Sequence, residues 1–200
     1  MKRTFFFTFF LIIVLSVLTA EDTEQPKQPE SVATYEAIHK GDQYINLMVG
    51  ASFPLFNIAP DGIHTTTNMK IGGNFVMGYS RFLTSRLALG GGIDLDFNST
   101  LGENIYFCIP FLFKPTYVFV IKNIHIPVTM SVGGVLHTYN SSVYFGPVVQ
   151  PSFGVFYQYS PEWSFGINTA WSLLPQWYAD SADDRAGNIL SVTAGIRYHF

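Results

Sequence analysis

The last eleven residues of the chain, Leu190-Ser191-Val192-Thr193-Ala194-Gly195-Ile196-Arg197-Tyr198-His199-Phe200, alternate between two kinds of side chain. The even positions carry leucine, valine, alanine, isoleucine, tyrosine and phenylalanine, and the odd positions carry serine, threonine, glycine, arginine and histidine. Successive side chains of a β-strand point to opposite faces of a sheet. The pattern therefore predicts a strand with one apolar and one mainly polar face.

The same alternation recurs from about residue 43 onward, for example between Leu87 and Phe97 and between Trp163 and Leu173. Longer connections rich in turn residues, at 57–67, 99–103, 139–145 and 178–187, alternate with tight turns, which is typical of transmembrane barrels. We predict eight antiparallel strands at 43–56, 68–82, 86–98, 104–121, 124–138, 146–160, 162–177 and 188–200.

Composition decides which face points outward. Charged residues make up only 12% of the chain, whereas soluble domains average about 25%. The second face consists mainly of small residues, which suit the crowded interior of an eight-stranded barrel better than a water-facing exterior. We predict an all-β, eight-stranded antiparallel transmembrane up-and-down β-barrel with its apolar face against outer-membrane lipid. A soluble barrel with the faces reversed is the alternative. On our assignment Ile167→Arg should destabilise the barrel more than Gly166→Ser.

The N-terminus has the features of a secretory signal peptide. Lys2 and Arg3 precede an apolar run that ends near Leu18, and Ala20 precedes a polar stretch. We predict a signal peptide at 1–20, a flexible periplasmic leader at 21–42 and the barrel at 43–200; an uncleaved anchor helix is the alternative. An even number of strands with tight turns at one end predicts periplasmic termini in the outer membrane of a diderm bacterium.

Over residues 43–200 the chain resembles the small outer-membrane barrels of the OmpX, OmpA and OmpW type. The alternating last strand with its terminal aromatic residue carries this resemblance. It implies that Tyr198 and Phe200 belong to an assembly signal that the barrel-assembly machinery reads.

Charged residues on the predicted inner face should form a polar network, because an isolated charge in a narrow lumen is costly. The predicted members are Lys70, Arg86, Asp94, Asp96, Lys114, Glu162, Arg197 and His199. We expect Asp94 and Asp96 to pair with some of the lysines and Arg197. The network would either plug the barrel or line a narrow path. Pro110 and Pro127 also fall on this face and predict a bulge or an interrupted ladder.

Other classes of function find little support. A net charge of −3 gives no basic patch for nucleic acid, and the lone Cys108 gives no metal-binding spacing or cofactor site. His64 and His137, with Ser141 or Ser142, lie toward the predicted extracellular side, but their spacing specifies no catalytic pair. A lipid A-modifying enzyme is thus a remote alternative, and we predict no enzymatic activity.

Two functions remain open. The resemblance to the OmpW type implies a narrow channel or permeability protein for small or hydrophobic solutes. The alternative is a non-conducting structural or adhesin-like barrel that contacts a host or surface ligand through its extracellular loops.

Overall fold

The computed structural model describes residues 37–102, 104–139, 142–178 and 184–200. The predicted signal peptide and residues 21–36 of the predicted leader lie outside this part of the chain. Within the described ranges, no helix is long and apolar enough to cross a membrane. The regular structure of the described residues consists of β-strands.

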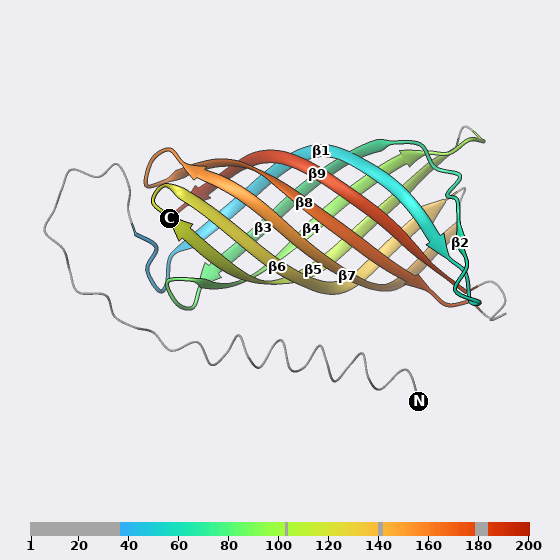
Figure 1. Cartoon of the computed structure of the whole chain (residues 1–200), viewed down its shortest axis with the longest axis horizontal. Helices are drawn as coiled ribbons and strands as arrows, with labels where there is room; N and C mark the ends of the chain where they lie inside the picture. Colours follow the sequence, from blue (N-terminus) through green and yellow to red (C-terminus); the bar gives the residue numbers. More distant parts are fainter. Residues whose placement is uncertain (1–36, 103, 140–141, 179–183) are drawn as a thin grey trace, which may run out of the picture. The chain divides into compact units, whose positions relative to one another are not determined.

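Eight long strands form a closed antiparallel barrel (Figure 1). Each pairs with the next one along the chain, and the last strand pairs with the first, so the sheet has no open edge. A short ninth strand, β2, pairs only with the end of β1. The strands are β1 (Gln43–Ile58), β2 (His64–Thr65), β3 (Gly72–Phe82), β4 (Leu87–Ser99), β5 (Ile105–Ile121), β6 (Ile124–Tyr139), β7 (Ser142–Gln158), β8 (Trp163–Gln176) and β9 (Arg185–His199).

The two ends of the barrel differ. One end, here called the base, carries the tight turns between β3 and β4, β5 and β6, and β7 and β8, together with the C-terminus (Figure 1). The opposite end, here called the mouth, carries β2 and the described ends of the connections between β1 and β3, β4 and β5, β6 and β7, and β8 and β9. β1 starts and β9 ends at the base, so both ends of the barrel sequence lie there.

The prediction of an all-β, eight-stranded antiparallel barrel is confirmed, and most predicted bounds agree within two residues. The predicted strand at 68–82 begins only at Gly72, and the predicted loop at 57–67 contains β2. The predicted loop at 139–145 is wrong: β6 and β7 stay paired up to Tyr139 and Ser142. The Val143-Tyr144-Phe145 run has high strand propensity and extends the hairpin.

Burial separates the two faces as the alternation predicts. On the outer face, Val49 is 61% exposed and Ile167 is 59% exposed, whereas the side chains of Ser52, Asp96 and Ser164 are completely buried inside. A surface of exposed phenylalanine, leucine, isoleucine and valine around a polar interior is the reverse of a soluble barrel. The predicted inside–outside assignment is therefore confirmed.

The described end of the predicted leader is anchored at the base. The Gly41 amide donates to the Phe82 carbonyl at 2.9 Å, and the Phe82 amide donates to the Asp42 carbonyl at 2.8 Å. Ile38 is buried in an apolar cluster with Tyr44, Phe82, Ala88 and Val118. Residues 38–42 thus help to close the base of the lumen.

Pro110 and Pro127 interrupt the pairing of neighbouring strands without shifting its register. Pro110 is buried, and the β4–β5 pairing skips from Ile93↔Phe111 to Asp96↔Cys108 in unchanged register. Pro127, also buried, coincides with a similar gap between β6 and β7. The register shifts instead between β1 and β9, at Pro54 and Phe56. The predicted interruption is therefore present at both prolines, but the bulge lies elsewhere.

Candidate functional site

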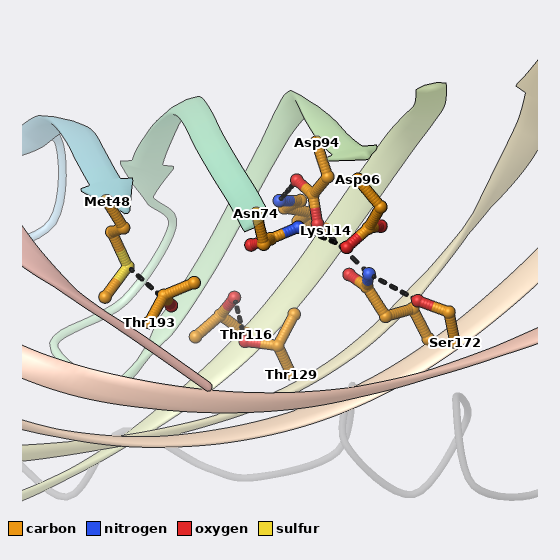
Figure 2. Close-up of polar contacts among 10 residues, drawn as sticks. Met48, Asn74, Asp94, Asp96, Lys114, Thr116, Thr129, Ser172 and Thr193 are labelled. Atoms are coloured by element: carbon orange, nitrogen blue, oxygen red, sulfur yellow. Dashed lines mark hydrogen bonds and ion pairs between the residues drawn. The ribbon is translucent and has the colours of Figure 1, made fainter. Parts of the chain in front are cut away.

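The lumen contains a polar network centred on Asp94 of β4 (Figure 2). Lys114 Nζ lies 2.8 Å from Asp94 Oδ1. Gln150 Nε2 donates to Asp94 Oδ2 and to Ser172 Oγ, each at 3.0 Å. Gly92 leaves room for the lysine, since a Cβ atom there would lie 3.1 Å from Lys114 Nζ. The network joins β4, β5, β7 and β8 across the barrel.

Asp96 lies next along the same face of β4 but has a neutral partner. Asn74 Nδ2 donates to Asp96 Oδ1 at 2.8 Å. Nearby, Ser52 Oγ donates to Asn98 Oδ1 at 3.3 Å. Among the described residues, no ion pair joins Asp96 to a cation. The expected pairing thus occurs at Asp94 and not at Asp96.

Arg197 is buried toward the base without a carboxylate partner in the described part of the chain. Its guanidinium carbon lies 3.5 Å from the centroid of the Phe156 ring and 4.8 Å from that of Tyr44, which are cation–π contacts. On the next inward position of β9, His199 Nε2 and Ser164 Oγ are 2.8 Å apart and share a hydrogen bond. The rings of Phe156 and Tyr44 thus take the place of the acidic partner that we expected for Arg197.

Three predicted members of the network lie outside the lumen. Lys70 is exposed before β3, because that strand starts later than predicted. Arg86 and Glu162 are exposed in turns at the base, where strand alternation no longer applies. Tyr198 and Phe200 lie on the outer face, 41% and 55% exposed, and their role as an assembly signal stays a prediction.

An apolar cluster fills the lumen between this network and the mouth. Its members are completely or almost completely buried and come from β5, β6, β7, β8 and β9: Cys108, Leu112, Val135, Val148, Leu174 and Ile189. The cavity left around the polar network measures only about 50 Å³. From the polar network to the apolar cluster the lumen is therefore packed, as expected for eight strands.

A much larger cavity of about 670 Å³ opens at the mouth. Leu174 and Ile189 of the apolar cluster belong to its lining, so the cluster forms its floor. The walls include Asn57, Thr65, Tyr106, Gln176, Arg185 and Gly187. This volume is within the range of small-molecule sites.

Arg185 is the charged residue in the described lining of the mouth cavity. Its Nε donates to Gln176 Oε1 at 2.7 Å, and its Nη2 donates to Tyr178 Oη at 2.9 Å. We did not anticipate this residue, because the predicted last strand began at 188 and left Arg185 in a loop. The weaker alternation of residues 185–189 gave no signal for it.

Among the described residues, the predicted histidines at the mouth contact aromatic side chains and are not hydrogen-bonded to Ser142. His64 stacks on Phe56 with ring centroids 4.5 Å apart, and buried His137 hydrogen-bonds to the Tyr106 hydroxyl. Ser142 is exposed and Ser141 lies outside the described residues. In the ranges that the structure describes, no group of three or more histidine, cysteine or acidic side chains could hold a metal ion.

Comparison with known structures identifies the same fold. Neisserial surface protein A (NspA) aligns over 80% of this chain and 100% of its own, with a TM-score of 0.63 and 11% identity. The outer membrane protein OprG from Pseudomonas aeruginosa aligns over 82% of this chain and 98% of its own, with a TM-score of 0.55 and 9% identity. At these identities the likeness concerns the fold: that of the small eight-stranded outer-membrane barrels.

Sequence comparison identifies the family. A protein-family model without a functional description matches residues 21–198. An uncharacterized protein of Treponema pallidum (strain Nichols) is 32% identical over 184 residues, which cover 87% of this chain and 84% of that protein. The chain therefore belongs to the family that this model defines, is related to the treponemal protein, and has the fold of the small outer-membrane β-barrels.

Proposed function

We propose that the protein spans the outer membrane of a diderm bacterium, with its mouth outside the cell and both termini in the periplasm. The apolar outer face supports contact with outer-membrane lipid, and the closed sheet leaves no unpaired edge in the bilayer. Three of the four connections at the mouth are longer than any turn at the base, which supports this orientation. The barrel-assembly machinery would insert it.

In this membrane the protein takes up small, partly apolar solutes at its mouth and does not conduct ions along the lumen. The observation that carries this proposal is a cavity of about 670 Å³ above a packed interior. A solute could occupy the cavity, but the apolar cluster and the Asp94–Lys114 network block the way to the base. The proposal involves no catalysis.

The seam between β1 and β9 offers such a solute a sideways route into the membrane. The register shifts between Pro54 and Phe56, next to the pairs Asn57↔Gly187 and Ile58↔Ala186. Asn57 and Gly187 also line the mouth cavity. A bulge weakens local pairing, so the barrel wall is least regular where it borders the cavity.

Filling the cavity tests this function. A Cβ atom on Gly187 would meet Asn57 Oδ1 at 3.6 Å and Leu174 Cβ at 3.7 Å, which are ordinary contacts. Gly187→Phe should therefore fold and occupy the cavity. The neutral probe 3-(4-fluorophenyl)propanol should bind the wild-type barrel in lipid nanodiscs, as seen by fluorine NMR against empty nanodiscs, and should not bind the variant. Equal binding to both barrels would contradict the proposal.

Exposed apolar side chains on the mouth connections favour a second candidate, contact with a host or surface ligand. Ile63 is 60% exposed and Ile71 is 66% exposed, and neither belongs to the lining of the mouth cavity. Joint replacement of Ile63 and Ile71 by serine should abolish adhesion of cells carrying the barrel to a ligand-coated surface but leave probe binding intact. Adhesion that survives this change would contradict the second candidate.

A further inference from the structure

The guanidinium of Arg185 is held in place at the wall of the mouth cavity by neutral groups. Gln176 Oε1 accepts from Nε and Tyr178 Oη accepts from Nη2, while Tyr178 Oη itself donates to Gln176 Oε1 at 2.9 Å. The three side chains thus form a closed triangle. The guanidinium carbon also lies 5.4 Å from the centroid of the Tyr178 ring.

A second layer of contacts supports this triangle. Tyr144 stacks on Tyr178 with ring centroids 5.5 Å apart and an interplanar angle of 27°. The Trp177 amide donates to Tyr144 Oη at 2.8 Å. Arg185 is therefore pre-organised, and a ligand that binds it need not order a flexible side chain.

The positive charge of Arg185 is not neutralised by a described residue. Asp184 is its neighbour in sequence, but Asp184 Oδ1 accepts from the Tyr178 amide at 2.8 Å. The ion pair found among the described residues joins Lys114 to Asp94, deep in the lumen. No described lining residue of the mouth cavity is acidic. A fixed cation that has no acidic partner among the described residues is suited to bind an anion beside this cavity.

The rest of the cavity suits an apolar group. Leu174 and Ile189 form its floor, and Tyr106 packs against the same apolar cluster. A ligand that contacts both the Arg185 guanidinium and this apolar floor carries a negative charge at one end and an apolar body at the other. A single fixed cation balances one charge, whereas a phosphate monoester carries nearly two at neutral pH.

We infer that the mouth cavity binds a small amphiphilic monocarboxylate, with its carboxylate on Arg185 and its apolar body over Leu174 and Ile189. This inference rests on the proposed uptake of solutes at the mouth and names their chemical class. Arginine is suited to the role because its planar guanidinium can donate two hydrogen bonds to one carboxylate.

A matched pair of probes tests the inference on the refolded barrel in nanodiscs of neutral lipid. 3-(4-Fluorophenyl)propanoate and 3-(4-fluorophenyl)propanol share the apolar body and differ in charge. We expect the carboxylate to bind the wild-type protein more tightly than the alcohol, with an affinity that falls as salt is added. Arg185→Gln should weaken carboxylate binding by roughly 10- to 100-fold, the effect of losing a hydrogen bond to a charged group. It should leave alcohol binding unchanged.

Arg86→Gln is the matched control, because Arg86 is exposed in a turn at the base. It should bind both probes as the wild type does, and heat-dependent gel mobility should show that each variant is folded. Arg185→Lys keeps the charge but loses the planar group, so it should restore only part of the carboxylate affinity.

The outcomes separate this inference from the function on which it rests. Equal binding of both probes, unchanged by Arg185→Gln, would overturn the carboxylate site and leave uptake at the mouth intact. Failure of the wild-type barrel to bind either probe would overturn both.

Discussion

Lys114 and Asp94 show how a charged pair can be accommodated inside the barrel. Both side chains are largely buried, and Asp94 also accepts from Gln150. Lys114→Met would leave a buried carboxylate without its cation, which should lower the free energy of unfolding by about 3–5 kcal/mol. Urea titrations of the barrel refolded into lipid vesicles measure this value.

The double variant Lys114→Met with Asp94→Asn is the control for this prediction. Removing both charges avoids the unpaired carboxylate, so the double variant should be more stable than Lys114→Met alone. A double variant as unstable as the sum of its two single changes would mean that the pair is not coupled.

Substitution of Ile167 tests whether the outer face of the barrel contacts lipid. Its side chain is 59% exposed near the middle of β8. Ile167→Arg should cost about 2–4 kcal/mol in a lipid bilayer, because a charge would then face hydrocarbon. Ile167→Leu should be nearly neutral in the same refolding titration. A well-tolerated arginine would mean that this face does not meet lipid.

The surroundings of Gly166, the neighbour of Ile167 on the inner face, argue against our sequence-based expectation that Gly166→Ser is milder than Ile167→Arg. A Cβ atom there would lie 2.3 Å from the Val155 carbonyl oxygen and 2.6 Å from atoms of the Phe156 ring. Phe156 also carries the cation–π contact of Arg197. We now expect Gly166→Ser to be as destabilising as Ile167→Arg; unfolding titrations in which the serine variant matches the wild type would contradict this.

At the scale of the element, β9 closes the barrel. Gln43 and Phe200 exchange two backbone hydrogen bonds, of 3.1 and 3.0 Å, at the last rung of the seam. Deleting Phe200 should reduce both refolding in vitro and assembly in cells, measured as the heat-modifiable band. Phe200→Leu keeps the rung, so it should reduce only assembly in cells if the aromatic ring is read as a signal. Normal assembly of the leucine variant would contradict that role.

The elements could be predicted because alternation reports the two faces of a strand directly. It failed where strands end. Lys70, Arg86 and Glu162 were assigned to the lumen by continuing the alternation past the strand bounds, and the structure places all three outside. The hairpin around 140–141 was predicted too short, because Asn140 and Ser141 indicated a long loop.

The candidate site could be predicted less well than the fold. The sequence placed Asp94, Asp96 and Lys114 on one face, but which carboxylate meets the lysine depends on cross-strand register and on the space left by Gly92. Arg185 was missed because its position depends on Gln176 and Tyr178, at the other side of a connection whose geometry has no sequence pattern.

At the scale of the whole molecule, the interior changes along the barrel axis. Ile38 and its neighbours close the base, a polar network and an apolar cluster fill the middle, and an open cavity remains at the mouth. This order suits a protein that binds at one end and blocks flow to the other.

Single-channel recording in a planar bilayer tests this account most directly. The wild-type barrel, first shown to be folded by its heat-dependent gel mobility, should insert and remain electrically silent, because side chains fill the lumen between base and mouth. Steady openings of the folded wild-type protein, altered by Asp94→Asn, would contradict the sealed lumen and show that ions pass through the polar network.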